Sequence, residues 1–291
     1  MATTNWSLTA HPAPRRPPLG RVVSSTLLYA AAVLVLLATG LPYLFMFGTA
    51  LKEPTEFIVN LWGLPRGIAL SNFGDAIAGG FGRYFINSVI VSVVSVVLTI
   101  LLASLASYPL ARMRFRLARP LFLLFLAGSM IPVHVTLIPI YVLSKGLGIY
   151  DSLWALLGPY IGFQLPISVF ILTEFFRGIP REIEEAARID GAGTLGIFAR
   201  IIMPLSAPAI STVAIYAFIF VWNEFIFALV LLSSPANMTI PLGLMQFFGE
   251  YRVNVPGLMA VLTLASLPVI VLYLVAQNRV VASVTAGAVK G

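Results

Sequence analysis

The residues with the most evident capacity to act on a partner lie in one polar segment, residues 178–204, of an otherwise apolar chain. The segment begins GIPREIEEAARIDG (178–191) and carries Glu184, Glu185 and Asp190. Carboxylates at helical spacing form a polar helix face that can meet another surface. The whole chain has two histidines and no cysteine, so thiolate metal sites are excluded, and His134 predicts no metal site. The chemistry predicted for the segment is recognition rather than catalysis.

The residue order of this segment predicts a short helix, a tight turn and a second helix at about 194–203. Pro180 suits the first helical position, and the glutamates follow in the early turns, where the helix dipole favours carboxylates. Gly191 tolerates the left-handed conformation that ends a helix. The Ala186-Ala187 face can dock in a shallow groove of a soluble partner, or the helix can rest on lipid headgroups. The residues alone favour the headgroup position without excluding docking.

The composition places the segment in a membrane protein. Hydrophobic residues make up 59% of the 291 residues and charged residues only 10%, against about 25% charged in soluble domains. Uncharged runs exceed the ~20 residues that cross a bilayer as a helix. We expect six helical spans near 24–47, 86–110, 120–143, 153–176, 206–232 and 256–277. The stretch 233–250, with its Ser, Pro and Gly, is expected to be an external loop.

The positions of the basic residues predict the orientation. With six spans both termini share one side, and most of the eighteen Lys and Arg residues fall there, which predicts that side to be cytoplasmic. The cluster Arg112, Arg114, Arg116 and Arg119 is interpreted as an anchor of this kind, with contact to a partner as the lesser alternative. The net charge of +7 is therefore a topology signal, and no nucleic acid partner is expected. Residues 1–21 predict a disordered cytoplasmic tail.

A few polar side chains inside the spans are candidates for a solute path. Glu224 falls near the outer edge of span five, next to Trp222 and Asn223. Acids in membranes are costly and face a cavity or a partner, so this group predicts either a solute contact or a structural hydrogen bond. Gln164 lies between Pro159 and Pro166, where a distorted helix is expected. It is interpreted as pore-lining, with interhelical packing as the alternative.

Nucleotide binding by this chain is not expected. No G-x-x-x-x-G-K-[ST] sequence occurs, and GAGTLG (191–196) lacks the lysine and follows a predicted helix rather than a strand. That stretch is interpreted as the connection between the two predicted helices. No cofactor is therefore expected to bind this chain.

Several stretches together resemble a known family. Glu185-Ala186-Ala187, then Gly191, Ile201 and Met203-Pro204, resemble the EAA loop of ABC importer permeases, with Met203 where leucine is more common. Four further stretches resemble the smaller permease of maltose-type sugar importers: YFINSVIVS (84–92), SYPLARMRF (107–115), FVWNEFIFAL (220–229) and TAGAVKG (285–291). The resemblance runs in order from about residue 22 to the end.

This resemblance implies an all-α type I permease fold, with six transmembrane helices over residues 22–280 and a coupling loop at 178–204. It implies a carbohydrate importer in the bacterial cell membrane, with both termini cytoplasmic. The implied partners are a second homologous permease, two cytoplasmic ATPase subunits that bind ATP and Mg, an extracytoplasmic solute-binding protein and membrane lipid. The implied ATPase-docking residues are Glu184, Glu185, Ala186, Ala187, Asp190 and Gly191, with Gly287, Lys290 and Gly291 of a cytoplasmic tail at 281–291 reaching towards the ATPase.

Three other functions remain open alternatives to sugar import. An ABC permease for a non-sugar solute fits the same motifs. A stand-alone secondary transporter predicts an inverted repeat and several intramembrane ionisable groups, which the sequence lacks. A membrane enzyme predicts clustered histidines or acids, whereas the spans offer only Glu224 and one histidine.

Overall fold

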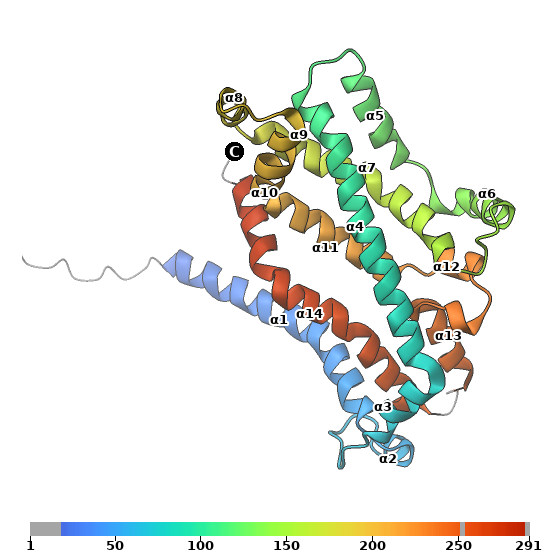
Figure 1. The fold of residues 1–291 in the computed structure, drawn as a ribbon. Coiled ribbons are helices and arrows are strands. Elements are labelled where there is room, and N and C mark those ends of the chain that lie inside the picture. The colour runs from blue at the N-terminus through green and yellow to red at the C-terminus, as the bar shows by residue number, and fades with distance from the viewer. Residues whose placement is uncertain (1–18, 251–253, 289–291) are drawn as a thin grey trace, which may run out of the picture.

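The computed structural model describes residues 19–250 and 254–288, and within these ranges it contains helices and no strands (Figure 1). Four helices are long and apolar enough to cross a membrane, and the number rises to six if each of two bent helix pairs counts as one span. The all-α membrane fold predicted from the sequence is confirmed. Helices satisfy their own backbone hydrogen bonds, which lipid cannot do.

The long helices match four of the predicted spans. They are α1 (Leu19–Ala50), α4 (Gly82–Arg112), α7 (Trp154–Gly178) and α14 (Val255–Ala288). Helix α7 continues without interruption through both of its prolines, on either side of Gln164. Helix α14 also continues past residue 280, into the segment predicted as a C-terminal tail. Its TAGA sequence contains two alanines, which favour a helix.

The predicted third span is two helices that meet at 95°. Helices α5 (Ala118–Gly128) and α6 (Val133–Gly146) are separated by an irregular link that ends at Pro132. Pro132 is extended, with φ −66° and ψ 129°, and proline disfavours a helical conformation in the residue before it. The single helix expected near 120–143 is therefore a bent pair, which keeps the count of six only if the pair is one span.

The predicted fifth span is also broken. Helix α11 (Ala207–Asn223) ends at an extended Glu224, and α12 (Ile226–Leu231) begins two residues later. At the other end of α11, the segment Thr194–Leu205 meets Ala207–Asn223 at 74°. The uncharged run 201–223 indicated a length that can span the membrane, but it did not indicate these changes of direction.

The remaining short helices lie between the spans: α2 (Pro54–Val59), α3 (Ser71–Ala76), η1 (Ile77–Phe81), η3 (Pro235–Asn237) and α13 (Ile240–Glu250). Helix α13 replaces most of the external loop expected at 233–250. Pro241 stands in its first turn, where proline suits a helix. Gly243 allows a close approach to α4, because a Cβ there would lie 2.3 Å from the Tyr84 ring. Both residues were interpreted as loop signals, and that interpretation is wrong.

Helix α4 is the centre of the packing. It contacts α7 and α11 along a face of small residues, and small residues let membrane helices approach closely. This face buries Ser88, Ser92, Ser95, Thr99, Ala103, Ser104 and Ser107. The side chains of Asn87 and Ser88 also bond the backbone of residues 236–240. These bonds hold the segment that leads into α13 against α4.

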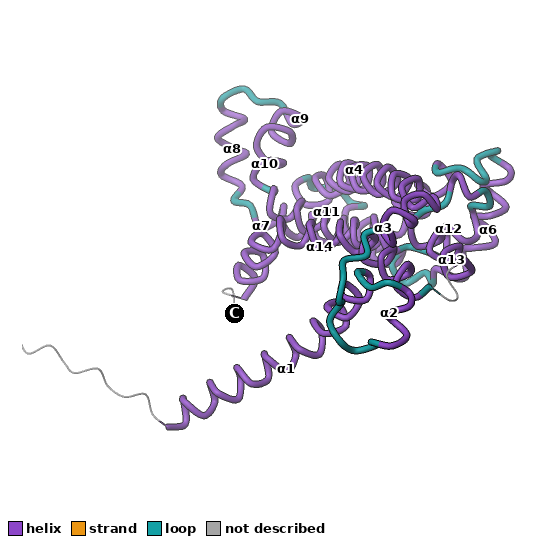
Figure 2. Tube along the Cα trace, turned by 90° about the horizontal axis from the view of Figure 1, so that it is seen from below, coloured by secondary structure: helices purple, strands orange, loops and turns teal. Residues whose placement is uncertain are grey.

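Helix α1 diverges from the bundle (Figure 2). It contacts α14, but none of its most hydrophobic 18-residue stretch is buried. An apolar helix with this little cover within the chain must lie against lipid or another protein.

A group of hydrogen bonds to one carboxylate, here called the Asp151 latch, lies at the end of the bundle opposite α8 (Arg181–Ile189). Asp151, between α6 and α7, accepts hydrogen bonds from the backbone N–H of Ser233 (2.8 Å) and Ser234 (2.9 Å) and from the Ser234 hydroxyl. Asn237 Nδ2 donates to the Asp151 carbonyl. Desolvation alone would raise the pKa of the Asp151 carboxyl, but these hydrogen bonds outweigh it and lower the pKa to about 2 from 3.8. The latch therefore stabilises the fold while the carboxyl is ionised.

We predict that Asp151→Ala lowers the thermal stability at neutral pH, by about 2 kcal/mol for donors left without an acceptor. Because the folded-state pKa is depressed, the stabilisation is complete above about pH 4 and is lost as the pH falls from about 4 towards about 2. Asp151→Asn is the matched control, since asparagine also tolerates the positive φ of 58° found here. Melting curves against pH in detergent check this, and a pH-independent difference between wild type and Asp151→Asn would contradict it.

Candidate functional site: the polar segment at the α8 end

The polar segment folds as the sequence predicts. Helix α8 (Arg181–Ile189) has Glu182 and Glu184 in its first turn. It is followed by α9 (Thr194–Ile197), η2 (Phe198–Ile202) and α10 (Met203–Leu205). Gly191 has φ +82°, and the bonds Gly191 N to Arg188 O and Ala192 N to Ala187 O form a Schellman cap. GAGTLG is therefore a helix–turn–helix connection, and Pro180 lies just before the first helical residue rather than on it.

The underside of the segment is apolar and packs on the transmembrane helices. Ala187, Ile197, Phe198 and Ile202 are buried in one cluster with residues of α4, α7 and α11. The ring of Phe198 lies 5.1 Å from that of Tyr108 on α4. This burial holds the segment against the ends of the spans through the hydrophobic effect.

A buried ion pair fixes α8 to α4. Arg112, in the last turn of α4, places its Nε 2.7 Å from Glu184 Oε1, and these side chains are only 3% and 7% exposed. Its Nη2 also donates to the carbonyl of Ile179 at 2.7 Å, at the α7–α8 junction. One guanidinium therefore joins α4, α7 and α8. We call this arrangement the Arg112 clamp.

The outer face of α8 has no partner in the described residues. Glu185, Ala186 and Asp190 are exposed, and Ile189 is 87% exposed. A single exposed aliphatic side chain is ordinary on a protein surface, so the significance of this face lies in the fixed position of α8 rather than in Ile189. Ala187 and Glu184 point inward instead, so these two predicted docking residues position the helix rather than offer contacts.

The polar residues predicted for span five form hydrogen bonds within this chain. The Glu224 carboxylate accepts hydrogen bonds from Tyr160 Oη (2.8 Å) and the Phe227 backbone N–H (2.9 Å), and it thereby caps α12. Trp222 is buried at 3% exposure, and its Nε1 donates to the carbonyl of Ala265. Asn223 is exposed and bonds its own helix. Glu224 and Trp222 thus bond groups of this chain, and a solute contact stays a prediction.

Gln164 lies in the interior and not along a cavity. It is 1% exposed on the buried face of α7, and its Oε1 accepts no hydrogen bond from the described residues. Its position between packed helices agrees with the interhelical alternative, and the pore-lining role stays a prediction.

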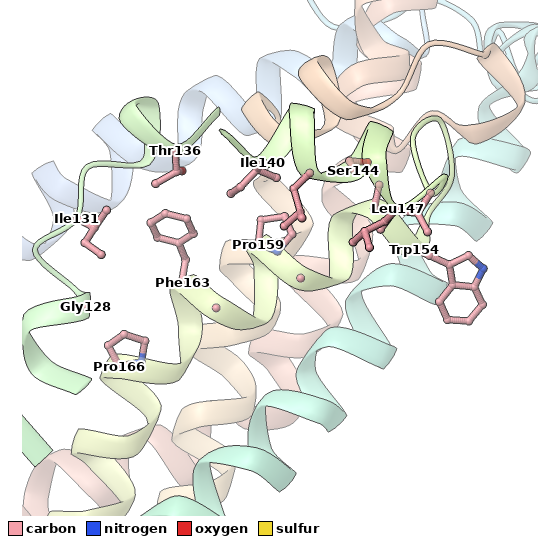
Figure 3. A pocket seen from close by; sticks show the side chains of 15 residues that line it. Gly128, Ile131, Thr136, Ile140, Ser144, Leu147, Trp154, Pro159, Phe163 and Pro166 are labelled. Carbon is pink, nitrogen blue, oxygen red and sulfur yellow. The ribbon is translucent and has the colours of Figure 1, made fainter. Parts of the chain in front are cut away.

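A cavity of about 510 Å³ lies between the bent α5–α6 pair and α7 (Figure 3). Trp154 stands at one end and Pro166 at the other. Gly158 and Gly162 line it, and a Cβ on either would meet nothing within 4 Å. Ser144, 3% exposed, also lines it, and its hydroxyl has no hydrogen-bond partner among the described residues. The sequence reasoning missed this cavity, although the G-x-x-x-G spacing is a recognised helix-packing signal.

The C-terminal residues predicted to contact the ATPase are only partly described. Gly287 lies near the end of α14, which runs towards the α8 end of the bundle (Figure 1). Lys290 and Gly291 lie outside the described residues. In the described part of the chain no three His, Asp or Glu residues gather as a metal site.

These features define a multi-pass helical membrane protein with a rigidly held polar segment at one end of its bundle. A profile of the family described as "Binding-protein-dependent transport system inner membrane component" matches residues 95–286. The chain belongs to this family, and the ABC importer permease predicted from the EAA-like spacing is confirmed. It is therefore a membrane permease of the inner membrane.

The similar proteins agree with this family. The chain is 46% identical over 88% of its length, and 93% of the relative, to a putative ABC transporter permease, ORF2, of Caldicellulosiruptor sp.. It is 35% identical to the sulfoquinovosyl glycerol permease SmoH of Agrobacterium fabrum, covering 94% and 98% of the two chains. It is 35% identical to the trehalose permease SugB of Mycobacterium tuberculosis, covering 89% and 97%.

A solved structure shares the fold. It is a crystal structure of a bacterial ABC transporter involved in the import of the acidic polysaccharide alginate. The TM-score is 0.77 at 23% identity, covering 91% of this chain and 99% of that one. This agreement confirms the type I permease fold predicted from the sequence.

The Arg112 clamp predicts that Arg112 and Glu184 are strongly coupled in their contributions to stability. Glu184→Leu should destabilise the protein by about 3–5 kcal/mol, because it leaves the buried Arg112 guanidinium without a carboxylate. Arg112→Leu should cost less, because Arg188 Nη2 remains 3.8 Å from Glu184 Oε2. The double variant should recover most of that loss. Thermal unfolding in detergent of the four proteins measures the coupling. The control is the exposed pair Arg177–Glu174, 42% and 48% exposed, whose coupling should be about 0–1 kcal/mol. If the changes in unfolding free energy of the two single variants simply add in the double variant, the two residues do not interact and the Arg112 clamp is refuted.

The capping role of Glu224 predicts a loss of stability rather than a loss of solute affinity. Glu224→Ala should cost about 1–2 kcal/mol, because the α12 N–H groups lose their acceptor. The neighbouring Asn223→Ala should have little effect on melting. Normal melting of Glu224→Ala combined with lost solute uptake would instead assign Glu224 to the solute path.

Proposed function

We propose that this chain is one of two permeases of an ATP-driven importer for a carbohydrate or glycoside. Family membership supports the importer class, and relatives named for sulfoquinovosyl glycerol and trehalose transport support the solute class. A permease for a non-sugar solute remains the second candidate, because its contacts with the ATPase subunits would be the same. The solute is expected from an extracytoplasmic binding protein.

The proposed coupling of this permease to an ATPase subunit rests on the outer face of α8. Glu185, Ala186, Ile189 and Asp190 are exposed on a helix whose other face is fastened by the Arg112 clamp. A separate ATPase subunit would bind this face, and the clamp would pass its movement to α4 and α7 as a rigid body. ATP and Mg would bind the ATPase subunit, and no part of this chain is assigned to ATP hydrolysis.

The charge distribution supports a cytoplasmic position for α8. The α4–α5 connection and the polar segment are rich in arginine: Arg112, Arg114, Arg116, Arg119, Arg177, Arg181, Arg188 and Arg200. Basic residues next to spans favour the cytoplasmic side. The Asp151 latch and α13 would then face the side where a binding protein delivers solute.

The second permease would cover apolar surfaces that this chain leaves open. The cavity beside α7 presents Gly158 and Gly162 without neighbours within 4 Å of a Cβ. A small-x-x-x-small face suits close helix packing in membranes. Helix α1, whose most hydrophobic stretch is unburied within this chain, offers a second such surface.

We predict that Glu185→Lys abolishes co-purification of an ATPase subunit and lowers solute uptake at least about tenfold, equivalent to about 1.4 kcal/mol. The reason is that the substitution reverses a charge on the proposed contact face while leaving the clamp intact. Gly191→Pro should do the same, because proline cannot adopt φ +82°.

The matched control is Glu53→Lys, the same reversal at an exposed position at the opposite end. It should keep both uptake and the ATPase subunit. Mild detergent extraction and identification of bound polypeptides provide the readout, with gel filtration to verify folding. Recovery of no ATP-binding subunit with the wild-type chain from its native membrane would contradict the proposed function.

A further inference from the structure

The connection between α4 and α5 combines exposed arginines with exposed apolar side chains. Met113, Phe115 and Leu117 are 44%, 41% and 60% exposed, and they alternate with Arg114 and Arg116. Arg119 follows in the first turn of α5. These three arginines are exposed and form no ion pair within the described part of the chain.

The short length of the α4–α5 connection limits how far it can extend from the membrane surface. Residues 113–117 join a candidate membrane span that ends at Arg112 to the first half of the bent α5–α6 pair. Five residues reach at most about 17 Å when fully extended, and the chain must leave and return within that length. The arginines therefore stay at the level of the lipid headgroups, with the apolar side chains beside them.

An apolar groove lies directly beside this connection. It has a volume of about 330 Å³ and is lined by Leu105, Tyr108, Pro109, Met113, Thr194, Leu195 and Phe198. Leu105 to Met113 extends about 12 Å along α4 at 1.5 Å per residue. Leu105 is 47% exposed on a membrane helix, and Leu195 is 74% exposed on α9. The groove thus runs from the membrane helix to the base of Arg114.

We propose that this site binds one anionic phospholipid. The guanidinium groups of Arg114, Arg116 and Arg119 hold the phosphodiester, since the arginine fork matches phosphate geometry. One acyl chain lies in the groove between α4 and α9. The bound lipid connects a membrane helix to the polar segment beyond the Arg112 clamp.

A lipid fits these observations better than a protein partner. A soluble subunit on the arginines would leave the interleaved Met113, Phe115 and Leu117 at the edge of its interface, whereas the headgroup region accepts charged and apolar side chains at the same level. Anionic lipids also attract basic residues at this boundary. The proposal does not depend on the proposed transport function, because lipid retention is measured on the permease alone.

The test uses the full-length chain in nanodiscs that contain equimolar phosphatidylglycerol and phosphatidylcholine with the same acyl chains. After mild detergent extraction, retained lipid is quantified by mass spectrometry. The wild type should retain phosphatidylglycerol over phosphatidylcholine by about tenfold or more. R114Q/R116Q should lose that preference, and R114K/R116K should keep part of it because the charge remains. The matched control R66Q/R83Q removes two exposed arginines at the opposite end and should keep the preference.

The groove is tested separately by Leu105→Trp, which fills it and should lower phosphatidylglycerol retention with all arginines present. High salt should release the lipid from the wild type, which provides a readout without any mutation. Equal retention of the two lipids by the wild type, or equal loss in R114Q/R116Q and R66Q/R83Q, would overturn the proposal. It would also be overturned if R114Q/R116Q kept the lipid and lost an ATPase subunit, since the arginines would then face protein.

Discussion

The ion pair between Arg112 and Glu184 is the interaction on which the α8 end depends. A charged pair at 3% and 7% exposure is costly to bury, and the contact of 2.7 Å between Arg112 Nε and Glu184 Oε1 offsets that cost by electrostatic attraction. Here the guanidinium also bonds the Ile179 carbonyl, so the ends of α4 and α7 and the start of α8 share one fixed point. The apolar underside then needs no further polar support. Movement imposed on α8 reaches α4 directly, without passing through a flexible loop.

At the opposite end of the bundle, polar side chains also hold separate segments together where helices end. At three positions near this end, a side chain bonds backbone groups that a helix leaves without a partner. Glu224 caps α12, Asp151 holds the residues that follow α12, and Asn87 with Ser88 holds the start of α13. In a medium where each unsatisfied polar group costs several kcal/mol, these side chains allow the chain to change direction. The polar residues of the spans therefore serve mainly to permit the irregular shape.

The sequence predicted the features that depend on local pattern. Long uncharged runs gave α1, α4, α7 and α14, and the proline, carboxylate and glycine order gave α8 and its cap at Gly191. It did not predict the 95° turn between α5 and α6, because composition indicates length and not direction. It misplaced α13, since Pro241 and Gly243 signal a loop unless a partner such as Tyr84 lies against the glycine.

The roles of single polar residues were the least predictable part. The cost of an acid in a membrane showed that Glu224 needs partners, but only the fold brings Tyr160 and the first turn of α12 to it. Arg112 was grouped with its neighbours as a topology anchor, and nothing in its local sequence separates it from Arg114. The distinction arises because Glu184, 72 positions later, returns to the end of α4.

Site-specific cross-linking from α8 in the native membrane tests most directly whether α8 contacts an ATP-binding subunit. The chain has no cysteine, so Ala186→Cys gives a unique and exposed attachment point for a benzophenone maleimide, with Leu64→Cys, 87% exposed at the other end, as control. The account predicts that illumination joins residue 186, and not residue 64, to an ATP-binding subunit. Adducts from residue 186 only to lipid, in membranes that still take up solute, would show that α8 lies on the membrane surface and would contradict it.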